Sequence, residues 1–595
     1  MYRSTFLMCG ILCCIYQTID KNKIFEINKW TTLKEQTAKR GPDILSTCQI
    51  TTDHWSGEFV ASVLWMQGSC PTLQPCVDEE GNILLWNGDI FTGILASNDD
   101  CDTLTLSTKL KSQNNVYQTL SHIEGPYSFI YFQKKTNTLY FGRDSIGRHS
   151  LLINIHVEDE SPFLTLCSIA HKNIENIIEL PAIGIFSMDL NASTFNLSCS
   201  PWHDTDDHFY SVIKNLNLPI NIRINQSILP ITIENSSSQL MNQESLNFID
   251  IVNSMDYKGK EMLEHLLKDV RVDKKVSQLW RLLNSSVHYR VNKKPRFCQS
   301  CVKLVINPNP ISNDECNCDH SKIGILFSGG LDSTILAAIT STIIPEDESI
   351  DLINVAFELT ANKNRSSSSA FDVPDRKTGY QALEELKEIF PQRKWNFIEV
   401  NITREELQEY CSKHICHLIY PLRTILDESL GCALWFASRG SGVSSSTNQL
   451  YQSPCRVLLL GMGADELFGG YTRHRTILRR SGWDALTKEL NQELLRIPER
   501  NLGRDDRIIS DHGRQARFPF LDDNLVKYVR SLKSWERCCP IDKMPSGIGD
   551  KLLLRLLAYK IGLKETATFP KRAFQFGSRI ANSKENAKDL SQWLK

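Results

Sequence analysis

The sequence predicts two domains of different fold class, an α+β amino-terminal domain and an α/β carboxyl-terminal domain with a doubly wound parallel sheet. From about residue 6 to 190, short β-branched and aromatic runs alternate with Gly, Asn and Asp, as in layered and mostly antiparallel sheets. From residue 322, strand-like and helix-like segments alternate, which indicates parallel strands covered by helices. Between about 195 and 320 the pattern is polar and irregular, as in a linker or an added segment.

Individual elements follow from local periodicity. In the amino-terminal part we expect strands at 61–66, 83–86, 127–132 and 138–141. Apolar residues three and four apart predict a helix over about 260–291. Beyond it we expect strands at 322–327, 351–357, 395–400 and 457–460, and helices after 330, over 381–389 and over 430–438. The Ser-rich stretches 365–369 and 441–446 are expected to be flexible surface insertions.

Composition narrows the class of protein. The 595 residues include 67 Lys+Arg and 69 Asp+Glu, so the net charge of −2 argues against a broad nucleic-acid-binding face. No run of about 18 apolar residues occurs, so no membrane helix is expected. The 19 cysteines are few for a disulfide scaffold of this length and predict reduced thiols. With no targeting signal evident, we expect a cytoplasmic protein that acts on small molecules.

The strongest motif is Ser-Gly-Gly-Leu-Asp-Ser at 328–333, which directly follows a predicted strand and opens a helix. Gly329 and Gly330 let backbone N–H groups approach an anion, and a helix amino terminus adds partial positive charge. Ser328 and Ser333 offer hydroxyl donors, and Asp332 can hold Mg²⁺. The pattern differs from the P-loop and predicts a phosphate site.

A second string, Gly-Met-Gly-Ala-Asp-Glu at 461–466, follows the predicted strand at 457–460. Ligands of open α/β sheets bind at the carboxyl ends of the strands, so Gly463 and Asp465 are expected opposite Asp332, with Asp465 as a second Mg²⁺ ligand. Lys551 and Lys571 are expected to stabilise departing pyrophosphate. Taken singly, each lysine could equally be a solvated surface charge.

These two strings resemble the synthetase domain of the asparagine synthetase family, an ATP pyrophosphatase fold that activates a carboxylate as an acyl-adenylate. The amino-terminal part resembles the family's class II glutamine amidotransferase domain, an αββα sandwich of the amino-terminal nucleophile type. The matching strings are Cys-Gly-Ile at 9–11, Arg-Gly-Pro-Asp at 40–43, Asn-Gly-Asp at 87–89, Gly-Arg-Asp at 142–144 and Arg-Phe-Pro-Phe-Leu-Asp at 517–522. The resemblance implies four segments: a removable or misassigned leader (1–8), an amidotransferase-like domain (9–190), a polar linker with a helix and a cysteine cluster (191–320), and a synthetase domain (321–595).

The resemblance also implies roles for the amino-terminal residues. Cys9 would be the nucleophile that hydrolyses glutamine, with its own α-amine as base once residues 1–8 are absent. Asn87 and Gly88 would form the oxyanion hole. Arg40 and Asp102 would hold the charged ends of glutamine. The alternative is that Cys9 is a buried strand thiol beside Cys13 and Cys14.

Three segments depart from the family pattern. Residues 61–65 lack the Arg and His expected there for the glutamine carboxylate, and Met462 stands where the family has a Glu. Asp427 and Glu428 occupy the segment that would contact aspartate, and acids there are expected to repel a carboxylate. The nucleotide strings are kept while the amine-transfer residues are altered. The sequence therefore predicts a glutamine-hydrolysing, ATP- and Mg²⁺-dependent amide synthetase acting on aspartate or another carboxylate, with a catalytically impaired nucleotide-binding scaffold as the alternative.

Four cysteines lie just before the first predicted synthetase strand, as Cys298-x₂-Cys301 and Cys316-x-Cys318, with His320 following. Paired thiolates at short spacing suit a structural, tetrahedral Zn²⁺ site, for which the four cysteines are the predicted ligands. The alternative is a set of reduced cysteines in a variable linker.

Overall fold

The computed structural model describes residues 9–18, 27–41, 43–68, 70–96, 101–113, 115–157, 162–229, 248–253, 259–306, 318–359, 370–545, 547–581 and 586–594. The expected leader (1–8), the Ser-rich stretch 365–369 and the predicted zinc ligand Cys316 lie outside these ranges. No described helix is long and apolar enough to cross a membrane.

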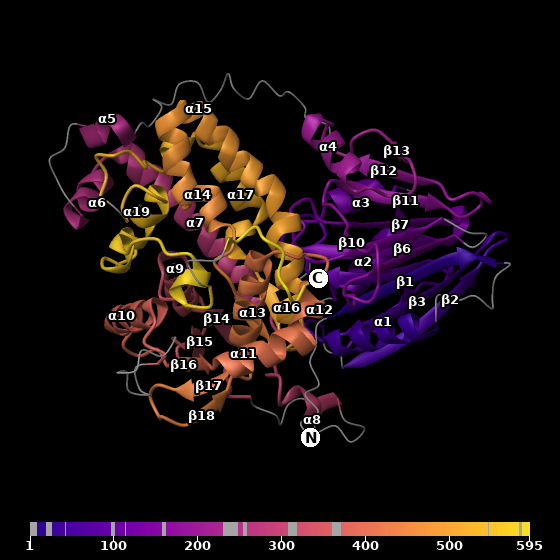
Figure 1. The fold of residues 1–595 in the computed structure, drawn as a ribbon, viewed down its shortest axis with the longest axis horizontal. Helices are drawn as coiled ribbons and strands as arrows, with labels where there is room; N and C mark the ends of the chain where they lie inside the picture. The colour runs from indigo at the N-terminus through magenta and orange to yellow at the C-terminus, as the bar shows by residue number, and fades with distance from the viewer. Residues whose placement is uncertain are drawn as a thin grey trace.

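Two stacked sheets form the amino-terminal half (Figure 1). The first is antiparallel, in the order β10 (Ile178–Glu179), β8 (Leu152–His156), β9 (Phe163–Cys167), β1 (Gly10–Gln17), β3 (Trp55–Val63) and β2 (Ile44–Thr51). The second runs in the order β13 (Ile222–Ile224), β12 (Leu197–Pro201), β11 (Gly184–Asp189), β7 (Thr138–Arg143), β6 (Tyr127–Gln133), β5 (Ile83–Gly88) and β4 (Cys76–Val77). All neighbours in it are antiparallel except β12 and β13.

Strand β1 explains why the sandwich has four layers. Its side chains alternate between two buried surfaces, so the strand is apolar on both faces. Ile11, Cys13 and Ile15 pack in the core between the sheets. Leu12 and Cys14 pack on the other face with Trp30 and Leu33 of α1 (Ile27–Arg40). Helices α2 (Asp102–Ser112) and α3 (Val116–Ser121) pack against β5 and β6 of the second sheet. The predicted αββα sandwich is confirmed.

The second sheet extends beyond residue 190. Strands β12 and β13 follow that residue and pair with β11 and with each other, and α4 (Asp207–Asn215) lies between them. The boundary expected at 190 thus cuts through one sheet, because the polar residues of 191–224 pair by their backbones and do not show the apolar runs of the earlier strands.

The segment before the third sheet is helical: α5 (Phe248–Asn253), α6 (Lys260–Leu267), α7 (Val270–Asn292) and α8 (Val302–Ile306). The helix expected over 260–291 is divided in two because Asp269 accepts hydrogen bonds from the backbone N–H groups of Arg271 and Val272 and caps α7. Along α7, Val272, Val276, Leu279, Leu283 and Val287 are buried in the carboxyl-terminal core. Figure 1 shows α7, in magenta, among the orange and yellow helices of that half.

The third sheet has the order β18 (Leu450–Gln452), β17 (Ser441–Ser444), β16 (Trp395–Ile402), β15 (Ile350–Phe357), β14 (Ile323–Leu326), β19 (Val457–Leu459) and β20 (Gln515–Arg517). From β16 to β20 all neighbours are parallel, which confirms the predicted doubly wound α/β domain. The strands on the two sides of the β14–β19 pair run outward in chain order, so this pair is the topological switch point. The stretch 441–446, expected to be flexible, instead begins with β17, an antiparallel strand added to β16.

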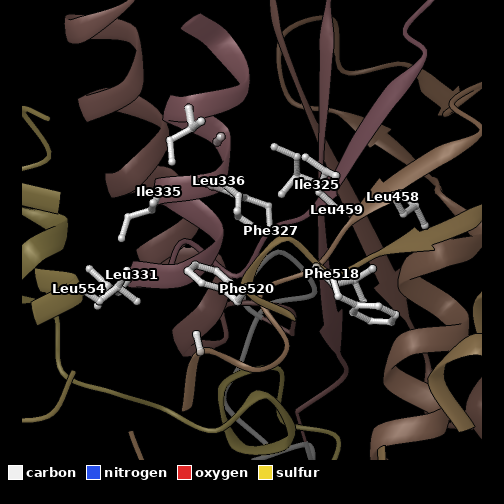
Figure 2. Close-up of a cluster of buried hydrophobic side chains, with 14 of the residues drawn as sticks. Ile325, Phe327, Leu331, Ile335, Leu336, Leu458, Leu459, Phe518, Phe520 and Leu554 are labelled. Carbon is white, nitrogen blue, oxygen red and sulfur yellow. The ribbon is translucent and has the colours of Figure 1, made fainter. Parts of the chain in front are cut away.

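Helices surround this sheet: α9 (Leu331–Ile343), α10 (Pro374–Ile389), α11 (Arg404–Tyr410), α12 (Cys416–Ile419), α13 (Ile425–Arg439), α14 (Ala464–Phe468), α15 (Thr472–Ile497), α16 (Gly503–Ser510), α17 (Asp523–Ser531), α18 (Ser534–Arg537), α19 (Leu552–Lys560) and α20 (Phe574–Gly577). Figure 2 shows Leu331, Ile335 and Leu336 of α9 near Ile325 and Phe327, in the core that carries the turn between β14 and α9.

Buried ion pairs join the two halves. Arg40 donates to Asp506 at 2.9 Å, with both side chains fully buried. Further pairs connect Arg148 to Asp523 (2.9 Å), Arg456 to Asp43 (2.9 Å), Arg517 to Asp89 (3.4 Å) and Arg507 to Glu179. Because removing one partner of such a pair leaves an uncompensated buried charge, these contacts fix the two halves against each other.

Candidate functional site

The turn between β14 and α9 carries the predicted phosphate loop at the switch point of the sheet. Gly329 has φ +74°, and a Cβ there would lie 2.4 Å from the backbone of Thr378 and Gly379, so only glycine fits. The Ser328 hydroxyl accepts from the Gly330 N–H at 3.2 Å, and the Ser333 hydroxyl donates to the Gly330 carbonyl at 3.2 Å. The loop is therefore fixed in shape, with the amino terminus of α9 directed at the crevice, where an anion is favoured.

A buried lysine joins the two strings that the sequence singled out. Lys551 Nζ lies 2.7 and 2.9 Å from the two carboxylate oxygens of Asp332 and 2.7 Å from Asp465 Oδ1. Lys571 Nζ lies 2.8 Å from Asp465 Oδ2. The structure thus brings together Asp332, Asp465, Lys551 and Lys571, although up to 239 residues separate them.

Burial and the two lysines act in opposite directions on the carboxyl groups of this cluster. Burial alone would raise the pKa of Asp465, but the Lys551 and Lys571 ammonium groups hold that pKa well below its usual range. Burial raises the pKa of Asp332, and Lys551 opposes that shift. Gly470 is required beside the cluster, since a Cβ there would lie 1.8 Å from Asp465 Oδ1. Carboxylates from two facing turns, with lysines beside them, are a donor set that fits Mg²⁺ and the phosphates of ATP.

The cluster opens into a cavity of about 710 Å³, a size typical of small-molecule sites. Ser328, Gly330, Asp332 and Ser333 line it, as do Asp465, Lys551 and Lys571. Gly463 does not line it but shapes the turn: its φ is +92°, and a Cβ there would lie 2.4 Å from Leu521. Two lining guanidinium groups, those of Arg500 and Arg572, form no ion pair within the described part of the chain.

The acids expected to repel a carboxylate are compensated. Asp427 caps its own helix through Thr424 and lies 3.2 Å from Arg504 Nη1, in a buried pair. Glu428 accepts a hydrogen bond from Ser591. Arg504 and local hydrogen bonds thus compensate part of the negative charge of these two acids. Met462 lines the cavity and offers no proton acceptor.

Two further acids of this cavity are buried, and sequence reasoning missed one of them, Asp375. Asp375, on the first turn of α10, is buried and lines the cavity, and its Oδ2 has no hydrogen-bond partner among the described residues. Burial raises its pKa from 3.8 to about 7. Burial likewise raises the pKa of Glu466, which accepts from the Tyr471 hydroxyl at 2.5 Å, to about 6. The Pro374-Asp375 pair that opens a helix after β15 is the signal that could have found Asp375.

The amino-terminal pocket is far smaller, about 50 Å³, and Cys9, Asn87, Gly88 and Asp102 line it. The Cys9 sulfur accepts from the Leu64 N–H at 3.4 Å, and burial raises the pKa of its thiol to about 12. The buried Asn87 Nδ2 has no hydrogen-bond partner within the described ranges. A donor of this kind next to a sulfur is what an oxyanion hole requires.

Arg40 and Asp102 are engaged elsewhere. Arg40 is buried and donates to Asp506 (2.9 Å), to the Ser168 carbonyl (3.2 Å) and to the Cys9 carbonyl (3.3 Å). Asp102 accepts from the Ile90 N–H at 2.7 Å and from Lys293 Nζ at 2.8 Å. Arg40 thus positions the Cys9 backbone and lies outside the pocket lining. None of the described lining residues is a Lys or Arg, so this pocket lacks a cation for the carboxylate of glutamine.

Of the predicted zinc ligands, the structure brings together Cys298, Cys301 and Cys318. They lie with His320, which the predicted ligand set did not include, and their ligand atoms are all within 4.8 Å of one another.

Comparison with known proteins places this arrangement in a family. The family model described as asparagine synthase matches residues 318–496 and 479–595. An asparagine synthetase domain-containing protein of Drosophila melanogaster is 40% identical over 610 residues, which cover 99% of this chain and 100% of the relative. This chain belongs to the asparagine synthase family. Its amino-terminal half is amidotransferase-like, with two stacked sheets between helical layers.

Other relatives of the asparagine synthase family differ in how much of the chain they match. The human asparagine synthetase domain-containing protein 1 is 36% identical over 641 residues, 96% of this chain and 95% of the relative. Asparagine synthetase B [glutamine-hydrolyzing] of Escherichia coli is 24% identical over 236 residues, 38% of this chain and 36% of that protein. The two domain-containing proteins thus match this chain over nearly its whole length, whereas the Escherichia coli enzyme matches it over about a third of that enzyme's length.

Proposed function

We propose that this chain is an ATP- and Mg²⁺-dependent ligase that forms an amide through an acyl-adenylate, with aspartate as the first candidate for the carboxylate. One observation carries the proposal: Lys551 lies between Asp332 and Asp465 at the switch point of the parallel sheet, inside a cavity of about 710 Å³.

The chemistry follows from the charges around that cavity. A carboxylate oxygen attacks the α-phosphorus of ATP, the bond to the β-phosphate oxygen breaks, and pyrophosphate departs. Mg²⁺, held by Asp332 and Asp465, would neutralise the phosphates. Lys551 and Lys571 would stabilise the departing pyrophosphate, and the N–H groups at the start of α9 would bind a phosphate. The guanidinium groups of Arg500 and Arg572, which form no ion pair with the described residues, suit recognition of a substrate carboxylate.

The second step needs a base, because ammonia that attacks the acyl carbon loses a proton as AMP leaves. Met462 cannot accept that proton. Asp375 lines the same cavity with an oxygen that has no hydrogen-bond partner among the described residues, and burial raises its pKa to about 7, near the value that suits a general base at neutral pH. We therefore assign Asp375 to this role within the proposal.

The ammonia for this step has two candidate sources. Glutamine hydrolysis by Cys9 needs a free α-amine, and mass spectrometry of the mature amino terminus checks whether Cys9 is the first residue. The pocket of about 50 Å³, with no Lys or Arg among its described lining residues, favours a second candidate function, in which the amino-terminal half is a structural scaffold and free ammonia is the amine.

The test is pyrophosphate release from ATP with aspartate and either ammonia or glutamine, in the wild type and in Asp332→Ala. Asp332→Ala is expected to weaken Mg²⁺-dependent ATP binding by about 100-fold or more, since a metal ligand is lost. Asp347→Ala is the matched control: it removes an exposed acid just beyond the far end of the same helix. Unchanged nucleotide affinity in Asp332→Ala would refute the site, and absence of turnover with intact ATP binding would favour the impaired scaffold.

A further inference from the structure

The cysteine cluster lies away from the nucleotide cavity, where α8 and β14 begin. Cys298 and Cys301 sit in the turn that leads into α8, and Cys318 and His320 precede β14. Cys298 and Cys318 are buried, Cys301 is half-buried, and His320 is exposed. The three sulfur atoms therefore lie on the inner side of the cluster, and the His320 imidazole lies on the solvent side, from which an ion can reach the site.

The distances are those of a metal tetrahedron. His320 Nδ1 lies 3.6 Å from the Cys298 sulfur, 3.5 Å from the Cys301 sulfur and 3.7 Å from the Cys318 sulfur. A tetrahedral zinc ion, with Zn–S of about 2.3 Å and Zn–N of about 2.0–2.1 Å, holds sulfur and nitrogen ligands about 3.6 Å apart. One nitrogen equidistant from three sulfurs at this spacing is the arrangement of a Cys₃His site.

The backbone around the sulfurs supports thiolates. The Cys301 N–H donates to the Cys298 sulfur at 3.4 Å, and the Cys298 N–H donates to the Cys318 sulfur at 3.4 Å. Such donors orient the ligands and stabilise their negative charge. We propose that Cys298, Cys301, Cys318 and His320 bind one structural zinc ion, with His320 in place of the Cys316 that the sequence predicted.

The position of the loop shows what the ion would fix. The Gln299 N–H donates to the Pro454 carbonyl at 2.9 Å just before β19, and Gln299 Nε2 donates to the His512 carbonyl at 2.8 Å just before β20. With Cys318 before β14, the site lies where three neighbouring parallel strands start, at the edge opposite the nucleotide cavity.

The site also touches the amino-terminal half. Trp65 packs with Phe297, Cys298, Val302 and Cys318 in one buried cluster, with the Trp65 and Phe297 rings 6.4 Å apart. Trp65 lines the Cys9 pocket. Its backbone N–H donates to the carboxylate of Asp43, which also pairs with Arg456. The ion would therefore hold one wall of the Cys9 pocket against the start of the third sheet.

The experiment uses the full chain purified without chelators, with metal analysis and X-ray absorption at the zinc edge. We expect about one zinc per chain, with three sulfur neighbours at about 2.3 Å and one nitrogen at about 2.0–2.1 Å. Less than about half an equivalent of zinc, or iron with acid-labile sulfide in its place, would overturn the site. Four sulfur neighbours would overturn the assignment of His320.

Variants provide an independent arm. His320→Ala and Cys301→Ala are expected to lower the bound zinc at least about tenfold under competition with a weak chelator. Cys316→Ala, which removes the other thiol of the same Cys-x-Cys pair, is the matched control and is expected to keep the ion. Loss of zinc from Cys316→Ala together with its retention in His320→Ala would contradict the proposal. If a variant does not fold, the X-ray absorption spectrum of the unmodified chain still identifies the ligands.

Discussion

The two pockets of this molecule differ in room and in charge. The carboxyl-terminal cavity has about 710 Å³ and is lined by two guanidinium groups without an ion pair among the described residues, while the pocket at Cys9 has about 50 Å³ and no described Lys or Arg in its lining. Both keep the residue strings of their domain type. This difference between the two pockets shows that a sequence motif can keep the turn that carries a catalytic residue. Whether a substrate fits depends on the side chains around that turn.

The largest expected effect concerns the charged cluster of the large cavity. Lys551→Met leaves the buried carboxylates of Asp332 and Asp465 without their shared cation, so we expect a loss of about 3–5 kcal/mol in the free energy of unfolding at neutral pH. Denaturant unfolding followed by intrinsic fluorescence checks this. The matched control is Lys571→Met, a more exposed partner of Asp465, for which we expect about 1 kcal/mol. Equal losses in the two variants would contradict the central role of Lys551.

The next effect is a pH dependence that Asp375 adds in the large cavity. The folded chain raises the pKa of Asp375 to about 7, so the folded state holds this proton more tightly than the unfolded state. The stability that this provides is complete below the ordinary value of 3.8 and is lost as the pH rises through about 7. We expect the loss to be about 1 kcal/mol per pH unit.

Asp375→Asn does not titrate and should lack this decline. Denaturant midpoints measured at about pH 5 and about pH 7.5 test the difference between variant and wild type. Asp372→Asn, which changes an exposed acid one turn away, should retain the wild-type pH dependence. The assignment fails if Asp375→Asn shows the same slope as wild type.

The smallest effect is expected at the closed pocket. Because burial raises the pKa of the Cys9 thiol to about 12, little thiolate is present near neutral pH. We expect Cys9→Ala to change ammonia-dependent pyrophosphate release by less than about twofold, or about 0.4 kcal/mol. The buried strand thiol Cys13 gives a control through Cys13→Ala. Glutamine-dependent release that exceeds the ammonia-dependent rate and disappears in Cys9→Ala would show the pocket to be a working glutaminase.

Much of the fold could be predicted because its strands are apolar on both faces. Strands β14, β15 and β19 stand out in the sequence as buried runs, and their alternation with helices is sufficient to predict the parallel sheet. Strand β17 was missed because its Ser-rich sequence indicates flexibility, yet it pairs with β16 through its backbone, which composition does not report.

The site shows the same limit. Asp332 and Asp465 were predicted from the strings around them, and both line the cavity. Asp375 carries no comparable string, and its sequence signal is limited to the Pro374-Asp375 start of a helix. Its burial against Gly577, where a Cβ would lie 1.9 Å from its carboxylate, appears only in the structure. Arg40 was expected at a substrate from the family resemblance, and its partner Asp506 could not be found because it is 466 residues away in the sequence. Long-range pairing of charges is decided by topology and leaves no local pattern.

The buried arginines between the halves set a limit on how this protein can be divided. A fragment that begins at residue 318, where the asparagine synthase match starts, would leave Asp506 without Arg40 and Asp523 without Arg148. It would also lack α7, whose valines and leucines fill the core of that half. We therefore expect that the synthetase part does not fold by itself. Fusions, truncations and recombinants of this protein would have to keep both halves together as one cooperative unit.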